Sequence, residues 1–254
     1  MRRFADKVAV VTGAGHGIGR ASALRFADEG ATVAVLDIDP ALAEETVAAI
    51  GDGGETAGAW AVDVADRDRV SAAVGEICER WGRIDVLHSN AGILRPGTVL
   101  EIEQRDWDAS FAVNVGGMLN SARAVLPQLR QHAGTIVNTA STAAIVGEAG
   151  MVAYCSTKGA VASLTRQLAI DFAGDAVRVN CVCPGWIDTG FSDDLLADVS
   201  EREIAEAIAH QVPLNRQGQA AEVAGAVAFL ASEDASYVTG ASLVIDGGMS
   251  SSMI

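Results

Sequence analysis

A tyrosine and a lysine stand four residues apart in the stretch AYCSTKGA, residues 153–160, and both side chains are of types that exchange protons. Tyr154 is one of only two tyrosines in 254 residues. Residues four apart share one face of a helix, so the phenol and the Lys158 ammonium would lie close together there. By itself this spacing favours an ordinary pair on a helix surface, and only the rest of the chain can give it a chemical role.

A glycine-rich stretch near the N-terminus, TGAGHGIG at 12–19, has the composition of a phosphate-binding loop. It follows the β-branched run 7–12 and leads into a segment of helical periodicity that begins at Gly17. Glycines there permit a tight turn and let backbone N–H groups approach a pyrophosphate at the helix N-terminus. A glycine triplet alone is weak evidence, but its position between strand and helix predicts a dinucleotide site.

Asp37 stands eighteen residues after Gly19, at the end of the apolar run 32–37. A carboxylate at this point of a dinucleotide fold accepts hydrogen bonds from the adenosine ribose hydroxyls and repels a 2′-phosphate, so it favours NAD over NADP. His16, where an arginine would meet that phosphate, points the same way. The alternative is that Asp37 is a turn residue at the end of a strand.

Two further polar positions follow strand-like runs. Asp63 comes after the run 56–62 in VDVAD, and Asn90 comes after the run 84–89 in HSNAG. The carboxyl ends of parallel strands form the edge at which open α/β sheets bind ligands. Taken singly, Asp63 could equally cap a helix and Asn90 could be a turn residue.

The elements that must position these residues alternate along the whole chain. Apolar runs of strand length predict strands at 7–12, 32–37, 56–62, 84–89, 134–140, 177–183 and 241–247. Helical periodicity predicts helices from Gly17, after the Asp39-Pro40 cap, and at 66–81, 104–131, 152–173 and 220–231. Because the strands are continuously apolar, we expect a parallel sheet buried on both faces. The sequence predicts one α/β domain over 1–254, doubly wound (Rossmann), with about seven parallel strands flanked by helices.

Composition and charge exclude several classes of function. The formal net charge is −15 and the sequence pI is about 4.5, so neither nucleic acid nor an anionic membrane is an expected partner. No apolar run approaches the roughly 18–20 residues of a membrane span, and the first residues are too soon polar for a signal peptide. The four cysteines lie apart in apolar surroundings and the four histidines lack ligand spacing, so we expect no metal site and a cytoplasmic, reducing location.

The order of these and later motifs resembles the short-chain dehydrogenase/reductase family in its compact, single-domain form. The matching stretches span nearly the whole chain: TGAGHGIG (12–19), NAG (90–92), Asn114 in FAVNVGG, Ser141 in NTAST, YCSTK (154–158), CPGWIDT (183–189) and LASEDASYVTGASLVIDGG (230–248). Each is weak to moderate evidence alone, and together they are strong.

The resemblance implies an active-site tetrad of Asn114, Ser141, Tyr154 and Lys158. Tyr154 would be the acid/base, Ser141 would donate to the substrate oxygen, and Asn114 would hold a water that relays protons from Lys158. A free phenol has a pKa of about 10, so work near neutrality needs a fall of roughly 2–3 units. The Lys158 ammonium and the positive ring of the oxidised cofactor are expected to supply it.

The resemblance also implies the cofactor contacts and a lid. The cofactor-binding positions are Gly13, His16, Gly17, Ile18, Gly19, Asp37, Ile38, Asp63, Val64, Asn90, Ala91, Gly92, Tyr154, Lys158, Pro184, Gly185, Ile187 and Thr189. The polar, helix-forming segment at about 190–212 takes the place of a lid over the substrate. Loops at 93–98 (with Arg95), at 142–151 and after Trp186 are expected to line the substrate site.

The expected function is therefore an NAD-dependent oxidoreductase acting on a small secondary alcohol or ketone, with the helices at 104–131 and 152–173 available to build a homotetramer. One alternative is a 3-oxoacyl carrier-protein reductase of the same family, against which Asp37 and the charge of −15 argue. The other is a non-catalytic dinucleotide-binding sensor, against which the intact Ser141, Tyr154 and Lys158 argue.

Overall fold

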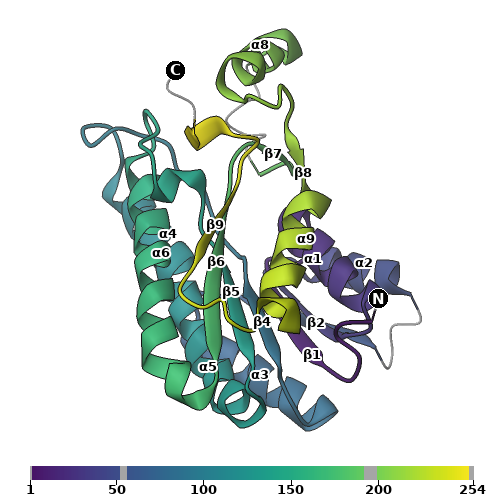
Figure 1. Cartoon of the computed structure of the whole chain (residues 1–254). Coiled ribbons are helices and arrows are strands. Elements are labelled where there is room, and N and C mark those ends of the chain that lie inside the picture. Colours follow the sequence, from purple (N-terminus) through teal and green to yellow (C-terminus); the bar gives the residue numbers. More distant parts are fainter. Residues whose placement is uncertain (1, 52–55, 192–198, 252–254) are drawn as a thin grey trace.

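A parallel sheet forms the centre of the molecule (Figure 1). The computed structural model describes residues 2–51, 56–191 and 199–251. The main sheet has seven strands in the order β3-β2-β1-β4-β5-β6-β9, and every pair of neighbours is parallel. Its strands are β1 (Val8–Thr12), β2 (Thr32–Asp37), β3 (Ala57–Ala61), β4 (Val86–Ser89), β5 (Thr135–Thr139), β6 (Arg178–Pro184) and β9 (Ser242–Ile245). The expected Rossmann-type architecture is confirmed.

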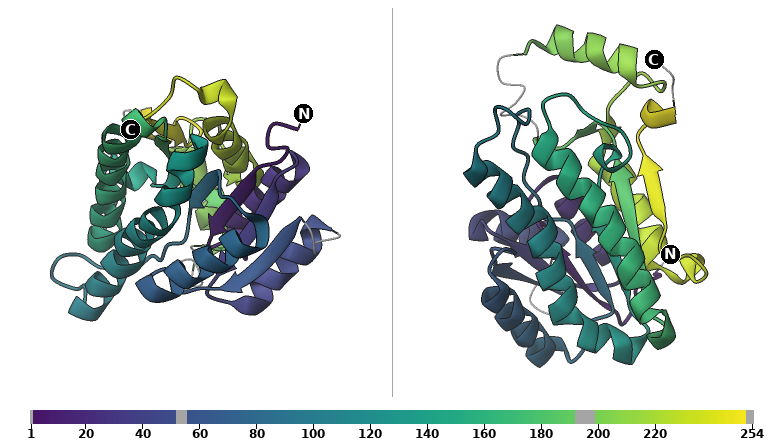
Figure 2. Two further views of the ribbon diagram at one scale, coloured as in Figure 1. Left: turned by 90° about the horizontal axis from the view of Figure 1, so that it is seen from below. Right: turned by 90° about the vertical axis from the view of Figure 1, so that its left-hand side faces the viewer.

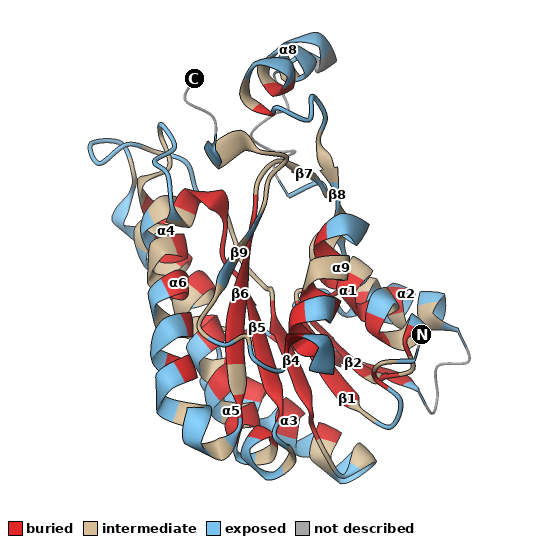
Figure 3. Cartoon of the chain, viewed as in Figure 1, coloured by how far each residue is buried: buried red, intermediate tan, exposed pale blue. Residues whose placement is uncertain are grey.

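Helices cover both faces of this sheet. One face packs against α1 (Gly17–Asp28), α2 (Pro40–Ile50) and α9 (Ala220–Ala231), and the other against α3 (Arg67–Trp81), α5 (Gly117–His132) and α6 (Val152–Phe172). Successive strand residues alternate between the two cores: Val10 belongs to the second face and Val11 to the first. Figure 3 shows the central strands β1, β4 and β5 buried throughout, while the edge strand β9 and the outer helix surfaces are partly or fully exposed. Both faces are covered, which explains the continuously apolar strands.

The helix expected over 104–131 is interrupted. The structure has α4 (Gln104–Phe111), a π-helical turn (Ala112–Gly116) and then α5. In that turn the buried Asn114 side chain accepts from Ile93 N at 2.7 Å and donates to Ile93 O at 2.9 Å. Helical periodicity does not distinguish an α-turn from a π-turn, and such turns occur frequently at functional sites.

Two aspartates begin helices as their positions require. Asp39 Oδ1 accepts from Ala41 N at 2.8 Å, and Pro40 occupies the first turn of α2. Asp66 caps α3 in the same way. Asp63, the other candidate cap, instead accepts from Ala65 N at 2.9 Å within the preceding turn.

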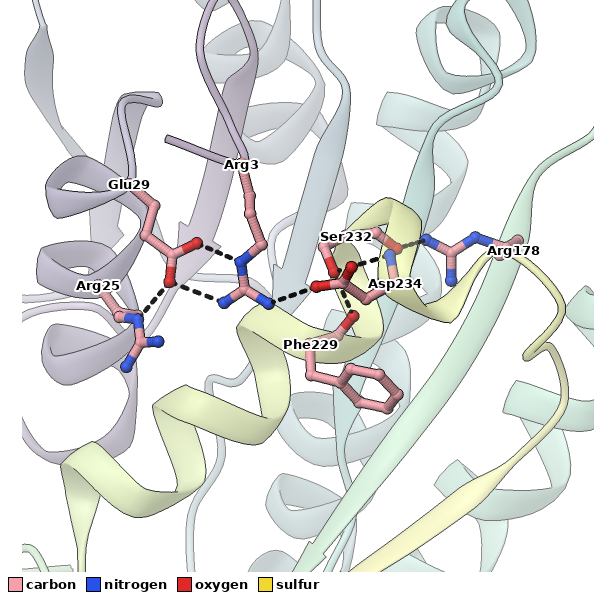
Figure 4. A network of polar contacts seen from close by, with 7 residues as sticks. All are labelled: Arg3, Arg25, Glu29, Arg178, Phe229, Ser232 and Asp234. Atoms are coloured by element: carbon pink, nitrogen blue, oxygen red, sulfur yellow. Dashed lines mark hydrogen bonds and ion pairs between the residues drawn. The ribbon is translucent and has the colours of Figure 1, made fainter. Parts of the chain in front are cut away.

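An ion-pair network joins the N-terminal segment to the amino edge of the sheet (Figure 4). The Arg3 guanidinium donates to Glu29 at 2.7 Å and to Asp234 at 3.2 Å. Arg178, at the start of β6, donates to the Ser232 carbonyl at 3.0 Å. These bonds tie the chain start, the end of α1 and the turn after α9 together.

A small extension lies beyond the carboxyl ends of the strands. It contains α8 (Glu201–Gln211), which stands apart from the layered body in Figures 1 and 2, and the short parallel pair β7 (Ile187–Asp188) and β8 (Gly218–Gln219), which periodicity did not predict. The lid expected at 190–212 falls partly on 192–198, which lie outside the described residues. No helix among the residues that the structure describes is long and apolar enough to cross a membrane.

Candidate active site

A cavity of about 540 Å³ opens at the carboxyl edge of the sheet. The glycine-rich turn, the ends of β2 to β6, the start of α6 and the segment 184–191 surround it. Every predicted site residue lines this cavity except Gly19 and Asn114, which lie directly behind its wall. The structure thus brings together positions that are up to 176 residues apart in the chain, from Gly13 to Thr189.

Glycine is required where the turn after β1 meets the neighbouring strand end. Gly13 has a φ of 60°, and a Cβ there would approach the Ala91 Cα to 2.8 Å. A Cβ on Gly19 would overlap the Gly13 carbonyl, so Gly19 supports the turn from within α1 rather than from the cavity wall. His16 precedes α1 without a side-chain cap, which leaves the first N–H groups of this helix without a side-chain partner.

Asp37 ends β2 at the cavity and is 5 % exposed. Its Oδ2 accepts from Gly15 N at 2.8 Å and its Oδ1 from Asp39 N at 3.0 Å. These bonds hold the carboxylate against the glycine turn. Each oxygen keeps a further lone pair for a ligand hydroxyl.

Asn90 links the glycine turn to β5 rather than forming an isolated turn. Its Nδ2 donates to the carbonyls of Thr12 and Gly13, both at 3.2 Å, and its Oδ1 accepts from Thr139 Oγ1 at 3.1 Å. The buried His88 ring lies 3.0 Å from the same hydroxyl through Nε2. Since Thr139 Oγ1 donates its proton to Asn90, His88 is the donor at Nε2, and burial lowers the pKa of this ring to about 3.

Lys158 is held at the back of the cavity. Its Nζ donates to the Thr139 carbonyl at 2.8 Å and lies 5.5 Å from the centroid of the Tyr154 ring. Burial lowers the pKa of this ammonium to about 8. Asn114 donates from Nδ2 to Thr157 Oγ1 at 3.1 Å, next to Lys158 in α6. The π-turn therefore packs Asn114 against the helix that carries the tyrosine and the lysine.

Tyr154 and Ser141 lie close together in the cavity wall. Ser141 caps a short 3₁₀ turn, and its Oγ accepts from Ala143 N at 3.1 Å. Burial raises the pKa of Tyr154 to about 12, the Ser141 hydroxyl acts to lower it, and the Glu148 charge raises it further. The Lys158 ammonium was expected to lower the pKa of Tyr154. The protein groups alone do not produce this lowering. The positive ring of a bound, oxidised nicotinamide is the remaining charge that would lower it.

Several lining residues were not predicted individually. Glu148 and Met151 come from the loop before α6, Trp186 and Phe191 from the segment after β6, and Gln217 and Met249 from later in the chain. The first four fall in or beside the loops expected to line the site. Gln217 and Met249 carry no signal in the sequence. Arg95 is exposed and lies 3.7 Å from Asp106, outside the cavity wall.

The wall fits a dinucleotide. It combines three features: glycines at positions where a Cβ would clash, N–H groups at the start of α1 without a side-chain cap, and a carboxylate at the end of β2. Among the described residues, no group of three or more histidine, cysteine, aspartate or glutamate side chains is placed to hold a metal ion.

Comparison with known proteins identifies the family of this chain. A family model described as "Enoyl-(Acyl carrier protein) reductase" matches residues 13–250. The chain belongs to the short-chain dehydrogenase/reductase family, as its motifs indicated. Members of this family use nicotinamide cofactors, NAD or NADP.

Three relatives illustrate the family. The chain is 40% identical to meso-2,3-butanediol dehydrogenase of Serratia marcescens, over 98% of this chain and 97% of that one. It is 38% identical to a 3-oxoacyl-(acyl-carrier-protein) reductase of Thermotoga maritima, over 97% and 99% of the two chains. The crystal structure of levodione reductase superposes with a TM-score of 0.94 at 34% identity, over 98% and 100%. These relatives support an oxidoreductase role for this chain.

Proposed function

We propose that this protein is an NAD-dependent oxidoreductase that interconverts a small secondary alcohol and its ketone, with Tyr154 as the acid/base. The observation that supports this most is one continuous cavity wall that carries Asp37 and the glycine turn as well as Ser141, Tyr154 and Lys158. A relative that acts on a butanediol is 40% identical over nearly the whole chain, which favours a small alcohol over a bulky one.

In this proposal the bound nicotinamide supplies or accepts the hydride. Ser141 donates a hydrogen bond to the substrate oxygen and orients it toward Tyr154. The phenol of Tyr154 gives up or takes the proton on that oxygen. The phenolate would be stabilised by Lys158 together with the positive ring of the oxidised cofactor, and Asn114 fixes α6 from behind. Gly13, Gly17 and the first turn of α1 hold the pyrophosphate.

The preference for NAD follows from the end of β2. A 2′-phosphate at this place would meet the Asp37 carboxylate. No arginine lines the described part of the cavity wall, and its one lysine is Lys158, at the other end. We expect kcat/KM with NAD⁺ to exceed that with NADP⁺ by about a hundredfold or more, and comparable values would contradict this assignment.

The test of the acid/base role uses both tyrosines of the chain. Tyr154→Phe should lower kcat by at least about a hundredfold while NADH binding, followed by fluorescence, is kept. Tyr237→Phe is the matched control, because Tyr237 is fully exposed and outside the cavity. Turnover by the Tyr154→Phe enzyme at the wild-type rate would refute the assignment.

The reductase alternative has one observation in its favour, the 38% identity to a 3-oxoacyl carrier-protein reductase. Such an activity needs an acidic carrier to dock. A chain of net charge −15 with no arginine at the described cavity wall is poorly suited to that. We further propose a single-domain subunit in a homotetramer, in a reducing compartment where Cys78, Cys155, Cys181 and Cys183 stay unpaired. Light scattering tests the assembly.

A further inference from the structure

Glu148 is a charged side chain at the substrate side of the cavity for which the proposed reaction has no use. It lies in the loop between β5 and α6, which is tied to the loop at 97 by a hydrogen bond from Gly97 N to Gly150 O at 2.5 Å. It lines the same cavity as Tyr154. The same cavity wall carries large apolar side chains, among them Leu94, Met151, Trp186, Phe191 and Met249.

The Glu148 carboxylate has no ion pair and no side-chain hydrogen bond among the described residues. This contrasts with the carboxylates at the opposite edge of the sheet, which are paired with arginines. Glu148 is exposed to solvent overall, and desolvation on its protein side raises the pKa of its carboxyl. An uncompensated carboxylate at a ligand cavity is available to a ligand as a hydrogen-bond acceptor.

The position of Glu148 also works against the acid/base. Its negative charge raises the pKa of Tyr154, whereas proton transfer near neutrality needs that pKa lowered. A neutral or apolar residue would serve Tyr154 better. A substrate group that binds the Glu148 carboxylate would screen this charge from Tyr154, and both residues line the same cavity.

We propose that Glu148 is a specificity-determining residue that accepts a hydrogen bond from a second hydroxyl of the substrate. The preferred substrate is then a small diol or hydroxyketone, and alcohols that carry a carboxylate or phosphate are disfavoured. An uncharged donor fits better than an ammonium, because an ammonium would share the cavity with the Lys158 cation and the positive ring of the oxidised cofactor. This inference rests on the proposed alcohol dehydrogenase activity.

The experiment compares three four-carbon probes with NAD⁺: 2,3-butanediol, 2-butanol and 3-hydroxybutanoate. The variants are Glu148→Gln, which removes the charge, and Glu148→Met, which removes both charge and acceptor. Glu79→Gln is the control, because it removes one exposed negative charge on α3, away from the cavity. NADH binding by each variant confirms that the cofactor half of the site is intact.

In the wild type we expect kcat/KM to fall in the order diol, mono-ol, hydroxy acid. Glu148→Met should lower the ratio of kcat/KM for the diol to kcat/KM for the mono-ol by about tenfold to a hundredfold. This is the change expected from losing a hydrogen bond to a charged group. Glu148→Gln should lower it less. Both variants should raise the ratio of hydroxy acid to mono-ol, and Glu79→Gln should change neither ratio.

Two results would overturn the inference while leaving the proposed function intact. One is oxidation of 2-butanol by the wild type with ratios that do not change in either Glu148 variant. The other is a wild-type preference for 1-amino-2-propanol over the diol, which would assign Glu148 to a cationic substrate. Failure of the wild type to oxidise any of these alcohols, or to reduce their ketones, would instead remove the proposed function and this inference with it.

Discussion

The charged side chains at the two edges of the sheet have different kinds of partner. At the amino edge the buried Asp85 accepts from Val8 N at 2.9 Å and from Arg83 Nε at 2.9 Å, and Glu29 is paired with Arg3 and Arg25. The hydrogen bond from Arg3 holds the pKa of Glu29 below its ordinary value. At the carboxyl edge Lys158 donates to a carbonyl and Asp37 accepts from backbone N–H groups, and neither has an ion pair with another described residue.

We infer that the charges at the amino edge contribute to stability and that those at the carboxyl edge are the ones that can bind ligands. Ion pairs stabilise the amino edge, where the network of Figure 4 also holds the N-terminal segment in place. Charges at the carboxyl edge that lack a counter-charge among the described residues remain available to a ligand. The chain has only two lysines, and it places one at each edge: Lys7 lies 3.5 Å from Asp85, and Lys158 lies in the cavity wall.

The largest effect is expected from exchanging these two lysines for methionine. Lys158→Met should lower kcat/KM by at least about a hundredfold. The free energy of unfolding should not fall in parallel, because the substitution also removes a buried, unpaired charge. Lys7→Met, measured by the same assays and urea denaturation, should keep the activity. Equal losses of activity in both variants would contradict the assignment of function to the carboxyl edge and of stability to the amino edge.

The second effect is one of stability. Asp85→Ala leaves the Val8 N–H and the Arg83 guanidinium without their acceptor, so the free energy of unfolding should fall by about 1–3 kcal/mol. The fraction that remains folded should keep its kcat. Glu103→Ala breaks an exposed pair with Arg105 at 3.0 Å and is the control, expected to match the wild type in denaturant. A loss of stability in the control as large as in Asp85→Ala would contradict this assignment.

The smallest expected effect is on the pH dependence of stability. It concerns His88, whose buried ring contacts the Thr139 hydroxyl behind the cavity wall. The unfolded histidine takes up a proton near pH 6.5, and the buried ring does so only near pH 3. Between these values the unfolded state binds more protons, so stability is lost as the pH falls, at about 1 kcal/mol per pH unit. His88→Leu should reduce the slope between pH 6 and pH 4 by that amount.

The control for His88 is Val137→Ala, a large-to-small change at a buried position of β5. It should lower the free energy of unfolding equally at pH 6 and at pH 4, because no proton is involved. A slope unchanged by His88→Leu would show that the ring does not resist protonation in the folded state.

The chain order of the elements was predictable because each depends on local pattern. The run at 32–37 matches β2 residue for residue, and the segment 220–231 matches α9. The polar residues Asp37 and Asn90 could be placed at one edge because parallel strands bring their carboxyl ends together. The break at 112–116 was not predictable, since helical periodicity does not distinguish a π-turn and Asn114 in this turn binds Ile93, 21 residues away in the chain.

The opening pair of the chemical motif, Tyr154 and Lys158, shows where local information ends. Their four-residue spacing and the order of the surrounding motifs are properties of the sequence, and so are the strand ends that must surround a cofactor. The raised pKa of Tyr154, the neutral His88 and the unpaired Glu148 depend on what burial brings near each group. Desolvation and charge act through space, so only the tertiary structure decides them.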